Sequence, residues 1–248
     1  MVNQSLPSGK RVSADALTEF CVEAMIRSGM DETDARVTAE VLVTTDTWGV
    51  YTHGTKQLRP LLKNVRHGRL DVNAEPEIVA NGPGWALYDG HYAMPMVTST
   101  LAMQTAMDKA EACGIGYAGV RHSSHFGAAG YYATMAVKQD MVGISMCNVD
   151  PCMTVPGGRG KILGTNPIAF AVPTGKEWPV FLDIATSIVA ASKIFAARSL
   201  GKIGNPEALP ALRAAVAKGN LGVINPHAYQ EAITKLESLV NTQSSGKE

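Results

Sequence analysis

The chain has 248 residues, of which 46% are hydrophobic and 18% charged, so it can build a large core and is not intrinsically disordered. Twenty-two basic residues balance twenty-two acidic ones, and the zero net charge lacks the basic excess typical of nucleic-acid-binding proteins. No run approaches the roughly 20 apolar residues of a membrane span, and the N-terminus has no secretory signal pattern. We therefore expect a soluble cytoplasmic protein without nucleic-acid or membrane partners.

Helical signals dominate the first 75 residues. Ser13 is a typical N-cap, Gly29 is a typical helix end, and apolar residues recur between them at helical spacing. Histidine His53 lies in a glycine-flanked break of this region. Three helices are expected, over residues 13–30, from 31 or 33 to about 48, and from 58 to 68.

From about residue 77, apolar strand patterns alternate with helical ones, which indicates an α/β fold. Strands are expected over 77–80, 85–88, 115–120, 141–148, 168–172 and 179–183, with helices over 94–112, 128–138 and from 186 to 197. Some connections are too short for a crossover helix, so the sheet should be mixed. The apolar runs 115–120 and 141–148 are typical of buried strands.

The C-terminal part has a different pattern. Residues 205–216 form one amphipathic unit of the kind found in helical repeats, although a single unit cannot support a solenoid. A strand over 221–224, a helix over 227–240 and a frayed polar tail are expected after it. The predicted organisation is an N-terminal helical region 1–75, an α/β domain 76–200, and a linker, strand and helix over 201–248.

Cysteines and histidines are few enough for their positions to be informative. The four cysteines lie among apolar neighbours, which favours buried reduced thiols over a zinc site, with a catalytic thiolate as the alternative: Cys21, Cys113, Cys147 and Cys152. Three histidines lie beside glycine or serine in predicted breaks, where a near-neutral pKa suits proton transfer: His53, His122 and His125. Hydrogen bonding to a turn backbone is the structural alternative for them. The remaining three are expected to have no specific role: His67, His91 and His227.

A metal site and a phosphate site are both conceivable. His122 and His125 are three residues apart and could share a metal, but an H-E-x-x-H motif and an evident third ligand are missing. The chain has neither G-x-G-x-x-G after a strand nor a P-loop, so a standard Rossmann fold is not indicated. Residues 164–167 and 183–187 could still offer backbone N–H groups to an anion, or the second segment could simply supply a helix N-cap.

Five motifs in order carry a family resemblance. They are GVYTHGT at 49–55, RHSSHFGAAGYY at 121–132, GISMCNVDP at 143–151, LGTNPIAFAVP at 163–173 and FLDIATS at 181–187. Together they resemble the malate/L-lactate dehydrogenase family, which is unrelated to the Rossmann-type lactate dehydrogenases. The resemblance implies that family's own mixed sheet, an L-sulfolactate dehydrogenase-like fold, and a homodimer. It also implies an NAD- or NADP-dependent oxidoreductase acting on a small 2-hydroxy or 2-keto acid.

The resemblance also implies roles for individual residues. His53 and His125 match catalytic positions, and Thr52, Lys56 and Arg59 are the candidates for binding the substrate. No metal is implied. The cofactor-binding candidates are Ser124, Asn148, Asp150, Gly164, Thr165, Asn166, Asp183, Ala185, Thr186 and Ser187.

The chain departs from the family pattern after residue 200. Family members are longer and carry a glycine-rich Lys-Gly segment there, whereas no such motif lies between Gly201 and Gly222. Residues 221–240 again resemble the family's late strand and helix, so an internal piece is expected to be missing. The alternative function is therefore a non-catalytic member that keeps the fold and dimerises but binds the cofactor poorly. A metal-dependent hydrolase using His122 and His125 is the third hypothesis.

Overall fold

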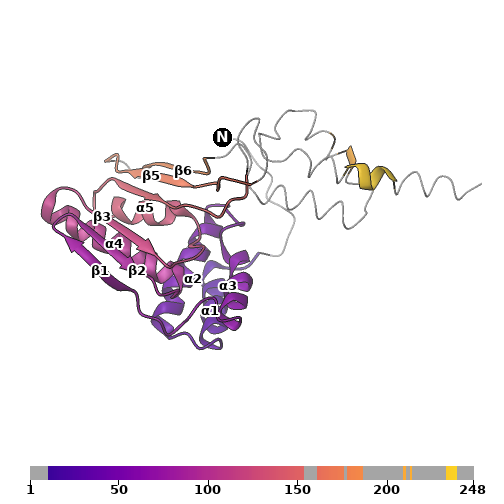
Figure 1. The fold of residues 1–248 in the computed structure, drawn as a ribbon, viewed down its shortest axis with the longest axis horizontal. Coiled ribbons are helices and arrows are strands. Elements are labelled where there is room, and N and C mark those ends of the chain that lie inside the picture. Colours follow the sequence, from indigo (N-terminus) through magenta and orange to yellow (C-terminus); the bar gives the residue numbers. More distant parts are fainter. Residues whose placement is uncertain are drawn as a thin grey trace, which may run out of the picture. The chain divides into compact units, whose positions relative to one another are not determined.

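The computed structural model describes residues 11–153, 161–175, 178–186, 209–210, 213 and 233–238. By its internal contacts the chain divides into two compact units. The first comprises Met1–Ser145 with Phe170–Leu182, and the second comprises Met146–Ala169 with Asp183–Glu248. The elements of the described parts are labelled in Figure 1. The division into regions 1–75, 76–200 and 201–248, which the sequence pattern predicts, stays a prediction.

Three helices open the first unit, as the sequence predicts (Figure 1). The hydroxyl of Ser13 accepts a hydrogen bond from the backbone N–H of Ala16 at 3.2 Å and so caps the first helix. Asp31 caps the second helix by accepting from the N–H of Thr33 at 2.8 Å. A short 3-10 helix that was not expected, η1, precedes the third. The bounds are α1 Ala14–Ile26, α2 Glu32–Thr47, η1 Thr55–Gln57 and α3 Leu58–Arg66.

These helices share one apolar core with the beginnings of two later helices, α4 (Pro95–Cys113) and α5 (Ala129–Val137). Full burial of a leucine- or methionine-sized side chain contributes roughly 1.5–3 kcal/mol, so this cluster is a major source of stability. Because α2 and α5 both contact this core, it fixes the elements that flank His53 and His125. The largest fully buried side chains in it are those of Met25, Leu42, Met94, Met96 and Tyr132.

A mixed three-stranded sheet in the order β1-β2-β3 lies against α4 (Figure 1). Strand β1 (Glu77–Gly82) is antiparallel to β2 (Trp85–Asp89), which is parallel to β3 (Tyr117–Arg121). Helix α4 is the crossover between the parallel pair and ends at Gly114, whose φ of 81° suits glycine. The register places Asp89 opposite Arg121, so both strands end at the same edge.

A second three-stranded sheet has the order β4-β5-β6, with β4 at Gly143–Met146, β5 at Ile168–Val172 and β6 at Val180–Ile184. The prediction that strands 115–120 and 141–148 are buried is wrong. Tyr117 in β3 is 64% exposed and Met146 in β4 is 63% exposed. Each of these strands lies at the edge of a three-stranded sheet, where few neighbours cover its side chains.

The second unit contains an isolated bridge between Met153 and Leu163 and an ion pair between Arg213 and Glu237 at 2.6 Å. Residues 209–210, 213 and 233–238 are helical, within two of the predicted helices. The strand expected over 221–224, the tail, and the helix expected after Thr186 lie outside the described residues.

Two further expectations concern membranes and thiols. No helix in the described part of the chain is both long and apolar enough to cross a membrane.

The cysteines differ in burial. Only Cys21 is fully buried, whereas Cys147 and Cys152 are half-buried and Cys113, the last residue of α4, is exposed. The expectation of four buried thiols is therefore wrong for Cys113. Burial, and then the charge of Asp183, raises the pKa of the Cys147 thiol to about 11, which disfavours a reactive thiolate there.

Candidate active site

Two catalytic candidates that are distant in sequence meet in the first unit. His53 lies in the turn that follows α2, and His125 lies in the segment between β3 and α5. Their rings are stacked with centroids 5.4 Å apart and planes inclined by 25°. The fold therefore brings together the histidines of the first two family-like motifs.

Two hydrogen bonds of Thr52 hold the turn that carries His53. The Thr52 hydroxyl lies 2.9 Å from His53 Nδ1, within hydrogen-bonding distance. Gln57 Nε2 donates to the Thr52 carbonyl oxygen at 2.6 Å. This contact at Nδ1 orients the ring, and an imidazole exchanges protons through its ring nitrogens near neutral pH.

The ring of His125 is oriented by the chain that follows it. The backbone N–H of Gly127 donates to His125 Nδ1 at 3.2 Å, so in the neutral ring the proton is on Nε2. Gly127 has a φ of 87°, and a Cβ there would lie 3.3 Å from Val41 Cγ1. Glycine is therefore favoured at this position both by its backbone conformation and by the close packing against α2.

The surroundings of His125 lower its pKa below the ordinary value of 6.5. Part of the residue is accessible to solvent, yet packed atoms around the ring desolvate it, and this is the largest cause. The nearby His53 acts in the same direction, while a backbone hydrogen bond opposes both. Near neutral pH His125 is accordingly biased towards its uncharged form.

The substrate-binding candidates follow His53 closely in the chain. Thr52 directs its hydroxyl to His53, as described above, whereas Lys56 in η1 and Arg59 in α3 are exposed cations on the next turn and helix. Their exposure is compatible with binding a carboxylate. The assignment of all three to the substrate stays a prediction.

Three of the cofactor candidates form one tight loop in the second unit. A Cβ on Gly164 would lie 2.0 Å from the carbonyl oxygen of Val149, so only glycine fits this approach. Asn166, with a φ of 34°, accepts a hydrogen bond from the Val149 N–H through its side-chain oxygen at 2.9 Å. Thr165 lies between them. This loop therefore packs directly on the residue between the candidates Asn148 and Asp150, which are both exposed.

The end of β6 is hydrogen-bonded to the same loop. The backbone N–H and the hydroxyl of Thr186 both donate to the Thr165 carbonyl oxygen, at 2.9 and 3.1 Å. The 164–167 and 183–187 segments thus meet within the second unit, although both Thr186 donors point to protein. Asp183 and Ala185 are exposed beside them, and Ser124 is exposed next to His125 in the first unit. Ser187 and the helix expected after Thr186 lie outside the described residues, so the hypothesis that Thr186 or Ser187 is a helix N-cap stays a prediction.

A polar cluster that the sequence did not reveal lies where β2 and β3 end. The carboxylate of Asp89 is buried and accepts hydrogen bonds from Arg121 Nε at 2.9 Å and from the His91 backbone N–H at 3.0 Å. His122 Nδ1 lies 2.9 Å from the same carboxylate. The backbone bond of His91, then those of His122 and Arg121, hold the pKa of Asp89 well below its usual range despite burial.

This cluster bears on two interpretations of the histidines. His91 was expected to have no specific role, yet its ring lies between Asp89 and Glu77, 3.5 Å from a carboxylate oxygen of each. His122 directs Nδ1 to Asp89 rather than sharing a ligand with His125. Within the described ranges no three histidine, cysteine or acidic side chains are grouped so that they could hold a metal ion. The C-terminal ends of parallel strands were the available signal for this cluster.

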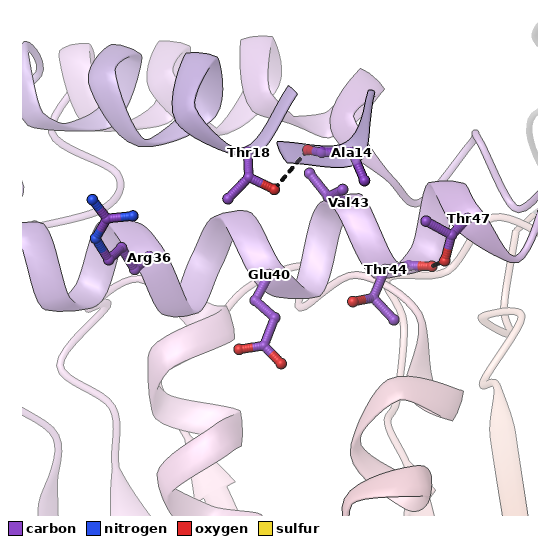
Figure 2. A pocket seen from close by; sticks show the side chains of 7 residues that line it. All are labelled: Ala14, Thr18, Arg36, Glu40, Val43, Thr44 and Thr47. Atoms are coloured by element: carbon purple, nitrogen blue, oxygen red, sulfur yellow. Dashed lines mark hydrogen bonds between the residues drawn. The ribbon is translucent and has the colours of Figure 1, made fainter. Parts of the chain in front are cut away.

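A pocket of about 340 Å³ lies elsewhere in the first unit, along α1 and α2 (Figure 2). Two of its threonine hydroxyls are used within their own helices: Thr18 donates to the Ala14 carbonyl oxygen at 2.9 Å, and Thr47 donates to that of Thr44 at 2.7 Å. None of the predicted site residues lines it. The lining residues are Ala14, Thr18, Arg36, Glu40, Val43, Thr44 and Thr47.

Comparison with known proteins agrees with these local features. The family model described as malate/L-lactate dehydrogenase matches residues 12–230. A malate dehydrogenase of Pyrococcus abyssi is 40% identical over 192 residues, which are 77% of this chain and 53% of that protein. A ureidoglycolate dehydrogenase (NAD(+)) of Escherichia coli strain K12 is 30% identical over 191 residues, 76% of this chain and 54% of that protein.

The structural comparison gives the same result. The solved sulfolactate dehydrogenase of Methanocaldococcus jannaschii superposes with a TM-score of 0.72 at 34% identity, covering 75% of this chain and 54% of that one. The fold is therefore the expected α/β type, with mixed strand pairing and an N-terminal helical region. The chain spans about half the length of the curated relatives it matches. The matched family model and these likenesses show that the chain belongs to the malate/L-lactate dehydrogenase family.

Proposed function

We propose that this chain is a cytoplasmic, homodimeric oxidoreductase that uses NAD or NADP to interconvert a small 2-hydroxy acid and its 2-keto acid. The observation that carries the proposal is the stacked pair of His53 and His125, because two imidazoles in contact provide proton transfer and polarisation at one place. Support also comes from relatives named malate, sulfolactate and ureidoglycolate dehydrogenases, all of which act on small hydroxy acids by their names.

The two histidines would divide the acid–base work. A second positive charge 5.4 Å away disfavours protonation of both rings, and the lowered pKa of His125 makes it the neutral partner. Neutral His125 would donate its Nε2–H to the substrate oxygen and orient it. His53 would give a proton to that oxygen in the reductive direction and take it back in the oxidative direction. Hydride transfer to or from the substrate carbon is the chemistry that a bound nicotinamide supplies.

The substrate carboxylate would be held by the residues around His53. Lys56 and Arg59 provide positive charge on exposed side chains just beyond the turn, and a cation is the usual partner of a carboxylate. The Thr52 hydroxyl can donate to a substrate carboxylate oxygen while it accepts from His53 Nδ1–H, because a hydroxyl donates once and accepts twice.

The second unit has features that suit a dinucleotide. Asp183 is an exposed acidic residue near the end of β6, and carboxylates accept hydrogen bonds from ribose hydroxyls. Only glycine fits at Gly164, where the loop packs on the Val149 carbonyl oxygen, and this packing fixes the backbone of the 164–167 loop. Asn148, Asp150, Thr165, Asn166, Ala185 and Thr186 would complete the binding residues of this unit, with Ser124 and Ser187 contributing to the same function.

The first experiment is titration of the purified chain with NADH and with NADPH, followed by nicotinamide fluorescence and by thermal shift. We expect saturable binding of one or both, and then oxidation of the bound nucleotide when pyruvate, oxaloacetate, glyoxylate or a sulfonated keto acid is added. Binding without oxidation by any keto acid would contradict the catalytic proposal. Analytical ultracentrifugation of the same sample should give the mass of two chains.

One observation favours a second candidate, a family member without catalysis. The chain corresponds to only about half of each relative named above, so the rest of each relative has no counterpart in the aligned stretch. Such a protein would fold and dimerise yet show no saturable response to either nucleotide. The titration separates the two candidates because only the enzyme binds the nucleotide.

A further inference from the structure

One carboxylate at the end of α2 is bonded to the turn that carries His53. Oδ2 of Asp46 accepts hydrogen bonds from the backbone N–H of Thr55 at 3.0 Å and from the Thr55 hydroxyl at 2.5 Å. The backbone carbonyl oxygen of the same aspartate accepts from the N–H of Gly49 at 2.9 Å. Asp46 therefore holds the first and the last residue of the 49–55 segment, and His53 lies between these two attachment points.

The carboxylate also packs directly against the residue that follows His53. A Cβ on Gly54 would lie 1.9 Å from Asp46 Oδ1 and 3.0 Å from the carbonyl oxygen of Leu42. No side chain can therefore stand between the main chain of the turn and the end of α2. The position of His53 is thus tied to Asp46 by contact as well as by hydrogen bonds.

Helix stability does not explain an aspartate at this place. Asp46 is in the last turn of α2, where the partial negative charge of the helix end disfavours an anion, and no basic residue lies in that turn. Its two strong acceptor contacts to Thr55 lie outside the helix. The side chain is therefore better accounted for by what it does for the turn than by what it does for the helix.

We infer that Asp46 is a positioning residue for His53: by binding Thr55, its side chain fixes the ring in stacking contact with His125. This inference rests on the proposed function only for its effect on turnover, because the effect on the geometry of His53 is measurable without it. An ionised carboxylate can accept both Thr55 donors at one oxygen, whereas an amide in its place presents an NH₂ group as well. Misplacing a reacting group by about 1 Å costs up to roughly 100-fold in rate.

The test compares four variants of the full chain. Asp46→Asn replaces the carboxylate acceptor by an amide, Thr55→Val removes the donor hydroxyl, and Thr55→Ser restores it. Asp31→Asn removes a favourable negative charge at the opposite end of the same helix. We expect kcat to fall about 10- to 100-fold in the first two variants, with nucleotide Kd changed less than about twofold. Thr55→Ser and Asp31→Asn should keep kcat within about twofold, although Asp31→Asn lowers Tm because the negative charge at the helix N-terminus is lost. An equal loss of kcat in Asp31→Asn would show that Asp46 matters only for stability.

A second readout does not depend on turnover. The ring C–H signals of His53, assigned by their loss in His53→Gln, can be followed by NMR as a function of pH. Thr55→Val leaves every charge in place, so a change in the shift or midpoint of His53 reports geometry, and Asp31→Asn should cause none. An unchanged His53 signal in both Thr55→Val and Asp46→Asn would overturn the inference, whatever the activity. A wild-type chain that neither binds nor oxidises nucleotide would instead contradict the proposed function alone.

Discussion

The carbonyl oxygen of Thr165 receives two hydrogen bonds from Thr186, one from the backbone N–H at 2.9 Å and one from the hydroxyl at 3.1 Å. These bonds join the end of β6 to the 164–167 loop within the second unit. If this unit holds the nucleotide, the hydroxyl bond fixes the position of the 164–167 loop relative to the end of β6.

Replacing Thr186 by valine keeps the shape and removes the hydroxyl bond. A hydrogen bond of this kind contributes about 1 kcal/mol, so we expect the Kd for the preferred nucleotide to rise about fivefold. Thr174→Val is the matched control, because that hydroxyl donates to the Trp178 carbonyl oxygen in a segment without cofactor candidates. Equal losses of nucleotide affinity in both variants would argue against a specific role for Thr186.

Each histidine of the stacked pair should be needed for chemistry rather than for nucleotide binding. We expect His53→Gln and His125→Asn to lower kcat about 10²- to 10⁴-fold, the usual contribution of a positioned proton-transfer group. Nucleotide Kd from fluorescence titration should stay within about twofold. His67→Gln, at the exposed end of α3, is the control and should retain wild-type kcat. A parallel loss of binding and turnover would assign the pair a structural role.

The pH titration of His125 should reveal both causes of its lowered pKa. We expect an NMR midpoint below 6.5 in the wild type. Removing His53 takes away the smaller lowering effect, so in His53→Gln the midpoint should rise but stay below 6.5 because desolvation persists. Since the folded pKa is lowered, the associated stability is present above pH 6.5 and is lost as the pH falls through the folded pKa. A midpoint that falls in His53→Gln would contradict the stacked geometry.

Asp89 should make stability sensitive to acid. Its hydrogen bonds to His91, His122 and Arg121 depress its pKa below the ordinary value of 3.8. The resulting stabilisation is present above pH 3.8 and is lost as the pH falls towards the folded pKa. Urea unfolding between pH 5 and pH 2.5 should therefore show a steeper loss of free energy in the wild type than in Asp89→Asn. The exposed Asp140 offers the control, and Asp140→Asn should keep the wild-type slope.

Glycine at position 127 should be required for both stability and activity. Gly127→Ala adds a Cβ at a φ of 87° and 3.3 Å from Val41 Cγ1, which we expect to cost about 1–3 kcal/mol of unfolding free energy. Gly175→Ala is the control, because its φ is also positive at 65° but nothing lies within 4 Å of the added atom. The difference in Tm between the two variants measures the packing contribution. A larger fall in Tm in Gly175→Ala than in Gly127→Ala would contradict the expected packing contribution at Gly127.

Local signals in the sequence were sufficient for most elements of the first unit. The Ser13 cap is where the sequence predicts it, the helix expected over 94–112 is present as α4, and β5 spans the predicted residues 168–172. Such features depend on a few neighbouring residues, so a single sequence reveals them. The exposure of β3 and β4 was not predicted, because apolar composition does not say whether a strand lies in the middle of a sheet or at its edge.

The site was predictable only in part for a similar reason. His53 and His125 were found because their motifs resemble a family, and no local pattern says that their rings meet. The Asp89 cluster depends on the parallel pairing that sets Asp89 opposite Arg121, a register invisible in either strand alone. Asp46 was missed because its partners Gly49 and Thr55 belong to a turn whose shape the sequence does not specify.

Strand β6 has a practical consequence for handling the protein. All five of its residues are exposed, it lies at the edge of its sheet, and Asp183 is its single charged residue. An apolar, weakly charged edge is a template for strand addition between molecules. The zero formal net charge at pH 7 removes the repulsion that would otherwise keep molecules apart. Colloidal stability should therefore be poorest near neutrality, and concentrated samples should stay clear longer in buffers a full pH unit or more to either side.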